Sequence, residues 1–159
     1  MRAAKHYFPV LKKGFVKKFL VLTCAIGLLA TGPGTAKGTI DDALSFALEA
    51  AMQATKEGFT VREEHWGGDL PVAQPKPIPH QLFKGNEYWF WIGSDVKGAV
   101  VSVHIYDSNG RLVEDERWQK GQKAAARIKP KRTGTYYLFV EVEKSPEERT
   151  SWGMAYGFR

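Results

Sequence analysis

The sequence predicts a mainly β fold, an antiparallel β-sandwich of the jelly-roll or immunoglobulin-like kind with one N-terminal amphipathic helix packed on it. From residue 80 onward, apolar and polar residues alternate with a period of two in several short segments. Turn-forming residues separate nearly all of these segments. Short antiparallel strands with one buried face each are typical of a two-sheet sandwich and not of a parallel α/β fold.

The first 36 residues have the order of a secretory signal. Residues 1–18 carry six basic and no acidic side chains, and an apolar run from Phe19 to Ala30 follows. This run of twelve residues is too short for a membrane anchor, which needs about twenty. Small residues predict cleavage after Ala36, so we expect a bacterial protein that is secreted or periplasmic, with no stable membrane insertion after cleavage.

The only cysteine, Cys24, lies inside the apolar run, so an acylated lipoprotein is the alternative, although Thr23 fits that signal poorly. Removing residues 1–36 takes away six of the 23 basic residues and leaves 17 against 17 acidic ones. The mature chain is therefore formally neutral, which excludes a general nucleic-acid-binding surface. Without Cys24 it forms no disulfide, so its stability must come from an apolar core.

Residues 37–79 are predicted to form a helix and a proline-rich connector ahead of a sandwich domain at 80–159. Thr39 can cap a helix of about eighteen residues, and Lys56 and Gly58 are its stop signals. Its apolar stripe consists of Ile40, Leu44, Ala47, Leu48, Ala51 and Met52. Phe59–His65 can form a short extended segment, and Pro75–Pro79 favours polyproline II.

The predicted sandwich strands are His80–Lys84, Glu87–Ile92, Ala99–Tyr106, Arg111–Glu116, Ala124–Ile128, Tyr136–Glu143 and Trp152–Phe158. Ser108-Asn109-Gly110 predicts a hairpin turn, because asparagine and glycine tolerate a positive φ. In the second strand both faces are apolar, with Trp89 and Trp91 together on one of them. That face is either covered by the helix or displayed for a ligand.

Residues 80–159 carry four motifs in a recognisable order and spacing: Gly85-Asn86-Glu87-Tyr88-Trp89-Phe90, then residues 101–113 (Val-Ser-Val-His-Ile-Tyr-Asp-Ser-Asn-Gly-Arg-Leu-Val), then Pro130 to Tyr137, then Ala155-Tyr156-Gly157-Phe158. This segment resembles the bacterial pre-peptidase C-terminal domain. The resemblance implies a β-sandwich of the kind appended to many secreted proteases and other exported enzymes.

Two departures from that family limit what the resemblance implies. Only a helix and a connector precede the sandwich here, so the role of an enzyme appendage is not carried over. Some family members have aspartates on the strand before the hairpin that look suited to calcium, whereas this chain has Ser102 and His104 there. This difference argues against a Ca²⁺ cofactor, and Asp107, Asn109 and Asp115 are the candidates for holding a hard cation by oxygen ligands.

The leading hypothesis is a non-catalytic binding module for a protein, a peptide or an envelope polymer. The chain has no Gly-x-Ser-x-Gly elbow and no His-Glu-x-x-His spacing, so we predict no catalytic residues and no enzyme. The first alternative is a carbohydrate-binding module that stacks sugars on Trp89 and Trp91, with Trp66 or Trp118 as a side wall. The second is a small secreted hydrolase whose site forms only in the tertiary structure.

Overall fold

The computed structural model of the protein describes residues 39–159. These residues form α1 (Ile40–Lys56), β1 (Thr60–Pro71), β2 (Lys76–Leu82), β3 (Tyr88–Gly93), β4 (Val100–Tyr106), β5 (Glu116–Lys120), β6 (Lys123–Ile128), β7 (Gly134–Lys144) and β8 (Arg149–Phe158). The predicted signal peptide, its cleavage point after Ala36 and Cys24 lie outside the described residues. None of the helices in the described range is long and apolar enough to span a membrane.

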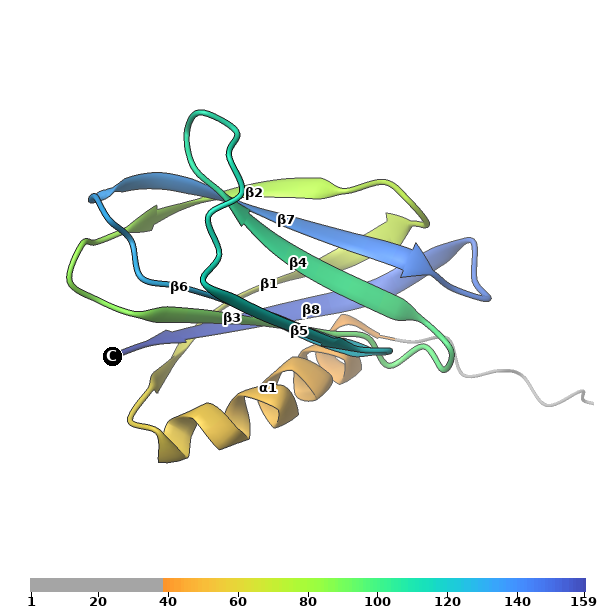
Figure 1. Ribbon diagram of the computed structural model, residues 1–159. Coiled ribbons are helices and arrows are strands. Elements are labelled where there is room, and N and C mark those ends of the chain that lie inside the picture. The colour runs from red at the N-terminus through yellow and green to blue at the C-terminus, as the bar shows by residue number, and fades with distance from the viewer. Residues whose placement is uncertain (1–38) are drawn as a thin grey trace, which may run out of the picture. The chain divides into compact units, whose positions relative to one another are not determined.

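The strands form two antiparallel sheets, as the sequence predicts. The five-stranded sheet has the order β1-β8-β3-β6-β5, and the three-stranded sheet has the order β2-β7-β4 (Figure 1). Between the sheets lies an apolar core to which β3, β4, β7 and β8 each give alternate side chains, among them Phe90, Val103, Leu138 and Met154. On β7 the residues that face this core are Tyr136, Leu138, Val140 and Val142.

Helix α1 begins and ends where its capping residues predict. The Thr39 hydroxyl accepts a hydrogen bond from the Asp42 backbone nitrogen at 3.1 Å, which satisfies one of the free N–H groups of the first turn. Asp41 and Asp42 complement the positive end of the helix dipole, and Lys56 complements the negative end. Gly58 follows with a φ of +91°, a left-handed conformation that ends the helix.

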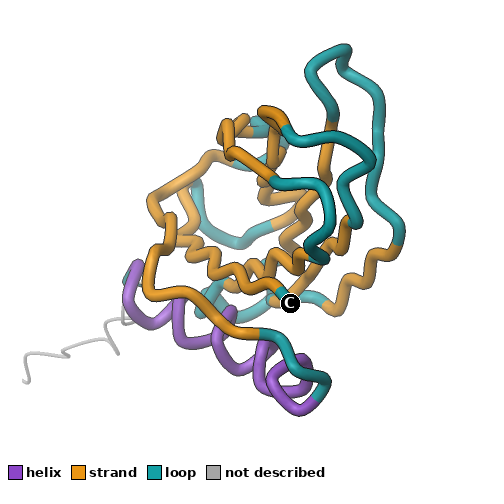
Figure 2. Tube along the Cα trace, turned by 90° about the vertical axis from the view of Figure 1, so that its left-hand side faces the viewer, coloured by secondary structure: helices purple, strands orange, loops and turns teal. Residues whose placement is uncertain are grey.

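The helix lies on the outer face of the five-stranded sheet, and its buried face differs from the predicted stripe (Figure 2). Ala47 and Ala51 of the predicted stripe are buried and Leu44 packs against the same cluster, but Ala43 and Ala54 complete the contact in place of Ile40, Leu48 and Met52. A Cβ atom on Gly93 would lie 2.5 Å from the Ala47 backbone nitrogen. Because small residues on both sides bring the helix backbone against the sheet, the larger Leu48 and Met52 are left exposed, and Met52 keeps 64% of its surface.

The sandwich also takes in residues before position 80, so the predicted domain boundary there is wrong. β1 runs through Gly67 and Gly68 to Pro71 and pairs with β8 along its length. The predicted polyproline connector is the edge strand β2, in which Pro77 and Pro79 pair opposite Phe139 and Tyr137 of β7. Proline is compatible with an edge strand because its missing N–H group can face away from the ladder.

The predicted strand Arg111–Glu116 is also wrong. Only an isolated bridge between Tyr106 and Leu112 forms there, and the strand β5 follows at Glu116–Lys120. Val113 donates its backbone N–H to the Ile105 carbonyl at 2.9 Å, so this segment runs along the edge of β4. The predicted turn at 108–110 is present, with Gly110 at a φ of +73°.

Candidate functional site

The outer face of the three-stranded sheet carries one exposed and three half-buried rings. Side chains alternate across a strand, so the core residues of β7 and β4 leave their neighbours pointing outward. On β7 these neighbours are Tyr137 and Phe139, and on β4 they are His104 and Tyr106. The register places His104 beside Phe139 and Tyr106 beside Tyr137, while the prolines of β2 flank the same two β7 residues on the other side.

These residues line a groove of about 740 Å³, which we call the aromatic groove. Its lining consists of Pro75, Pro77, Tyr106, Tyr137 and Phe139, the polar residues His104, Asp107, Ser108 and Glu141, and Gly110. Tyr106 and Phe139 meet edge to face with their ring centroids 4.9 Å apart, and Tyr137 keeps 36% of its surface exposed. An open apolar surface with a few polar groups at its rim is the usual form of a ligand-binding site.

His104 is held rigidly in this groove from both sides of its ring. Its Nδ1 lies 3.0 Å from Oε1 of the largely buried Glu114, whose Oε2 accepts the Ile105 backbone N–H at 2.8 Å. Nη1 of Arg117 lies 3.2 Å from the other ring nitrogen, Nε2. Arginine can only donate, so Nε2 accepts and Nδ1 carries the proton that is donated to Glu114. With both nitrogens engaged, His104 is not free to act as a base toward a serine.

The carboxylate of Asp107, a predicted cation ligand, stabilises the turn at the end of the groove. Its Oδ1 accepts the backbone N–H groups of Asn109 and Arg111 at 2.8 and 3.0 Å, and its Oδ2 accepts Nε of Arg111 at 3.0 Å. These hydrogen bonds, led by the backbone bond from Arg111, hold the pKa of the Asp107 carboxyl below its usual value.

The other predicted cation ligands are likewise engaged in the loop structure. Asp115 accepts the Lys129 backbone N–H at 2.5 Å, and the Asn109 backbone N–H is bonded to Asp107. Across residues 39–159 there is no group of three or more histidine, cysteine, aspartate or glutamate side chains placed to hold a metal ion. The Asp107 carboxylate thus shapes the hairpin turn, and the Asp115 carboxylate joins the loop before β5 to the chain just after β6.

The central rings of the predicted tryptophan platform are buried. Trp89 and Trp91 keep 7% and 1% of their surface and stack with ring centroids 6.3 Å apart beneath α1. Trp118 lies at the edge of that same helix–sheet cluster. Trp66 instead packs against the core between the sheets, with its ring centroid 5.1 Å from His80. Trp89, Trp91 and Trp118 line a small pocket of about 190 Å³ beside α1, and Trp66 is not part of its lining.

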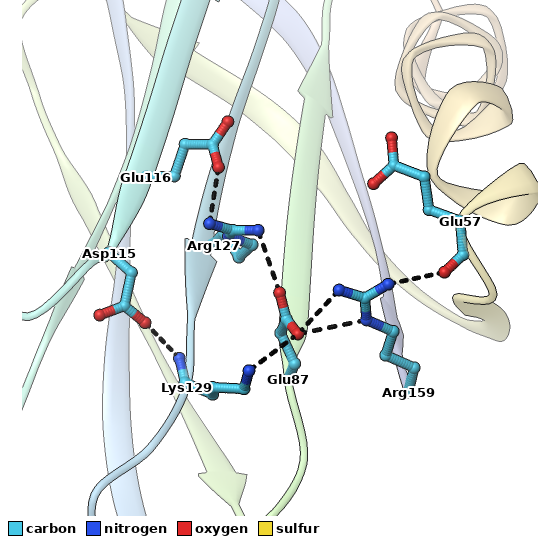
Figure 3. A network of polar contacts seen from close by, with 7 residues as sticks. All are labelled: Glu57, Glu87, Asp115, Glu116, Arg127, Lys129 and Arg159. Carbon is cyan, nitrogen blue, oxygen red and sulfur yellow. Dashed lines mark hydrogen bonds and ion pairs between the residues drawn. The ribbon is translucent and has the colours of Figure 1, made fainter.

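A second polar cluster, centred on Glu87, joins the ends of several elements (Figure 3). Glu87 Oε1 accepts Nη1 of Arg127 at 3.1 Å, and its Oε2 accepts Nη2 of Arg159 at 3.0 Å and lies 3.4 Å from Nζ of Lys129. Arg159 also donates to the Glu57 carbonyl at the end of α1 at 2.7 Å. This network ties β3, β6 and the end of β8 to the helix, which is a structural role.

Glu87 predicts a pH dependence of stability. Burial alone would raise its pKa, but the hydrogen bonds and charges of Arg159 and Lys129 outweigh burial and hold the pKa below its ordinary value of 4.5. A depressed carboxyl pKa stabilises the fold above pH 4.5, and this contribution is lost as the pH falls through the lower value of the folded state. We expect Glu87→Gln to lower the free energy of unfolding by about 1–3 kcal/mol at neutral pH.

Urea unfolding of both proteins between about pH 7 and pH 3 measures this difference. We expect the difference in the free energy of unfolding between wild type and Glu87→Gln to become smaller as the pH falls. Glu116→Gln is the control, because Glu116 is half exposed and Arg127 is its one ion-pair partner within residues 39–159. The Glu116→Gln substitution should lower the free energy of unfolding by less than about 1 kcal/mol. A gap for Glu87→Gln that stays constant to pH 3 would contradict this role for the carboxylate.

The sequence reasoning missed the aromatic groove, although the residues give a signal for it. Tyr137 and Phe139 lie on the same side of β7 as Glu141, on the face opposite the core residues. In a strand with one buried face, the residues on the solvent side are usually polar. Large aromatic rings at these positions are therefore a signal of a binding surface. A comparison with models of known protein families finds no match for the chain, and neither does a comparison with curated proteins.

Proposed function

We propose that the protein is an exported, non-catalytic binding module whose aromatic groove holds a protein, a peptide or a polymer of the cell envelope. The observation that carries this proposal is the set of partly exposed rings on the three-stranded sheet, lining a groove of about 740 Å³. The five-stranded sheet buries its outer apolar face under α1, whereas these rings have no such cover among residues 39–159.

A catalytic role has less support from the same residues. His104, the histidine of the groove, has both ring nitrogens engaged by Glu114 and Arg117. The buried carboxylate of Glu87 is neutralised by arginine and lysine partners. The resemblance of residues 80–159 to the pre-peptidase C-terminal domain implies a β-sandwich that is distinct from a catalytic domain, which agrees with the same proposal.

Binding is tested by cosedimentation of the purified protein with an envelope fraction from its own cells. We expect the wild-type protein to be retained and Tyr106→Ala/Tyr137→Ala to be retained about tenfold less, because central aromatic residues contribute most of the energy of such surfaces. Phe83→Ala is the matched control, since its ring is 53% exposed and outside the groove. Equal retention of the wild type and both variants, with the same melting temperature for all three, would contradict the proposal.

Export is a separate expectation that rests on the basic and apolar order of residues 1–30. Mass spectrometry of the native protein should find a chain that begins at Lys37, in the periplasm or the medium. Lys37 follows the predicted cleavage point after Ala36. Recovery of the protein from the cytosol with Met1 still attached is the contrary result.

A further inference from the structure

We infer that the ligand of the aromatic groove is a neutral glycan chain. This inference rests on the proposed function and names the chemistry of the ligand. It follows from three properties of the groove: the polar atoms that are left without partners, the charge of the lining, and the state of the two sheet edges beside it.

The free polar atoms of the groove suit sugar hydroxyls. The hydroxyls of Tyr106, Tyr137 and Ser108 and the carboxylate of Glu141 form no hydrogen bond or ion pair with any residue of the described range 39–159. A hydroxyl both donates and accepts, and a carboxylate accepts from two neighbouring donors. A sugar ring has hydroxyls around its rim and an apolar C–H face, so it can stack on Tyr137 or Phe139 while its hydroxyls reach these oxygens.

The charge of the lining disfavours an anionic polymer. Within residues 39–159 no lysine or arginine lines the groove, and of its two carboxylates Asp107 is paired with Arg111 while Glu141 has no partner in that range. A polyanion brought into the groove would meet the negative charge of Glu141 without a free cation to neutralise it. A neutral chain avoids this cost.

The sheet edges beside the groove disfavour an extended peptide. A peptide that adds as a strand needs free N–H and C=O groups along an edge. On the β2 side, Pro77 and Pro79 have no N–H to offer. On the β4 side, the Ile105 N–H and carbonyl are already bonded to Glu114 and Val113, and Gln119 Nε2 donates to the Val101 carbonyl at 2.9 Å. The outer face of the three-stranded sheet can therefore stack a ligand, whereas its two edges offer few free backbone groups to an added strand.

The volume fits a short stretch of such a chain. About 740 Å³ lies within the range of about 300–1,000 Å³ that is typical of ligand sites. The ring of His104, fixed by Glu114 and Arg117, lies beside Tyr106 with the two ring centroids 6.5 Å apart and the ring planes tilted by 56°. A rigid surface loses little conformational freedom on binding, which favours recognition by stacking.

The test is a titration of the protein, expressed from its full-length sequence, followed by calorimetry and by NMR. The probes are neutral hexasaccharides of glucan, mannan, xylan and chitin type, a hexagalacturonate as the anionic counterpart, and a proline-rich decapeptide. We expect at least one neutral hexasaccharide to bind, and Tyr137→Ala and Glu141→Gln each to weaken it about tenfold. Phe83→Ala should bind like the wild type.

The inference is overturned if every neutral hexasaccharide fails at millimolar concentration, or if the hexagalacturonate or the decapeptide binds the groove more tightly than all of them. The envelope assay separates this outcome from failure of the proposed function. If retention by the envelope fraction still depends on Tyr106 and Tyr137, the groove is a binding site for another ligand and only the glycan assignment fails. If retention does not depend on them, both proposals fail.

Discussion

Trp91→Ala is expected to lower the free energy of unfolding by about 3–5 kcal/mol, the largest effect of any single truncation considered for this protein. The Trp91 side chain is 1% exposed and fills the space between β3 and α1, in contact with Trp89 and the alanines of the helix. Truncation removes this burial and leaves a cavity that alanine side chains are too short to fill.

Urea unfolding followed by far-ultraviolet circular dichroism measures the effect. Trp118→Ala is the aromatic control, because that ring lies half-buried at the edge of the same cluster. We expect Trp118→Ala to lower the free energy of unfolding by about 1 kcal/mol. Equal costs for the two variants would show that Trp91 is not packed beneath the helix, and would reopen its use as a ligand platform.

Gly153→Ala is expected to destabilise the protein by about 3 kcal/mol, the upper end of what overpacking costs. A Cβ atom at this position would lie 2.5 Å from the backbone nitrogen of Leu44 and 2.6 Å from its Cα atom. Because backbone atoms of a helix cannot rotate away as the end of a side chain can, α1 must shift as a unit. We therefore expect the fluorescence of Trp91 to move toward that of an exposed indole.

The matched control is Gly68→Ala on the neighbouring strand β1. There the added Cβ atom would lie 3.6 Å from the nearest atom, Nε1 of Trp152, which is an ordinary contact. Its stability should stay within about 0.5 kcal/mol of the wild type or rise slightly. If Gly153→Ala is as well tolerated as Gly68→Ala, the close approach of helix and sheet is wrong.

The local signals of the sequence predicted helix α1 and strand β7 well. Thr39 and Gly58 mark the bounds of α1, and the alternation in β7 identifies its core face, because capping and strand periodicity depend on residues close in the chain. The stripe of α1 was misjudged. Leu48 and Met52 are its more apolar residues, but the depth of the contact is set by Gly93 and Gly153, which come from strands far along the chain.

The candidate site was less predictable for the same reason. Whether Trp91 or Phe139 faces solvent depends on which sheet the helix covers, and this is a property of the tertiary structure. The strands β3 and β7 both carry aromatic rings on both faces. The sequence prediction therefore chose the tryptophans of β3, and not the rings of β7, as the ligand-binding surface. Pro77 and Pro79 were read as a connector because proline is rare in strands, although an edge strand accepts it.

The measurement that tests the central claim most directly is NMR mapping of the isotopically labelled protein with solubilised envelope material. If the aromatic groove is the binding surface, the amide signals of residues 104–108 and 137–141 shift, while those of α1 and β1 stay in place. Shifts confined to α1 and the neighbourhood of Trp118, with the groove signals unmoved, would contradict the account.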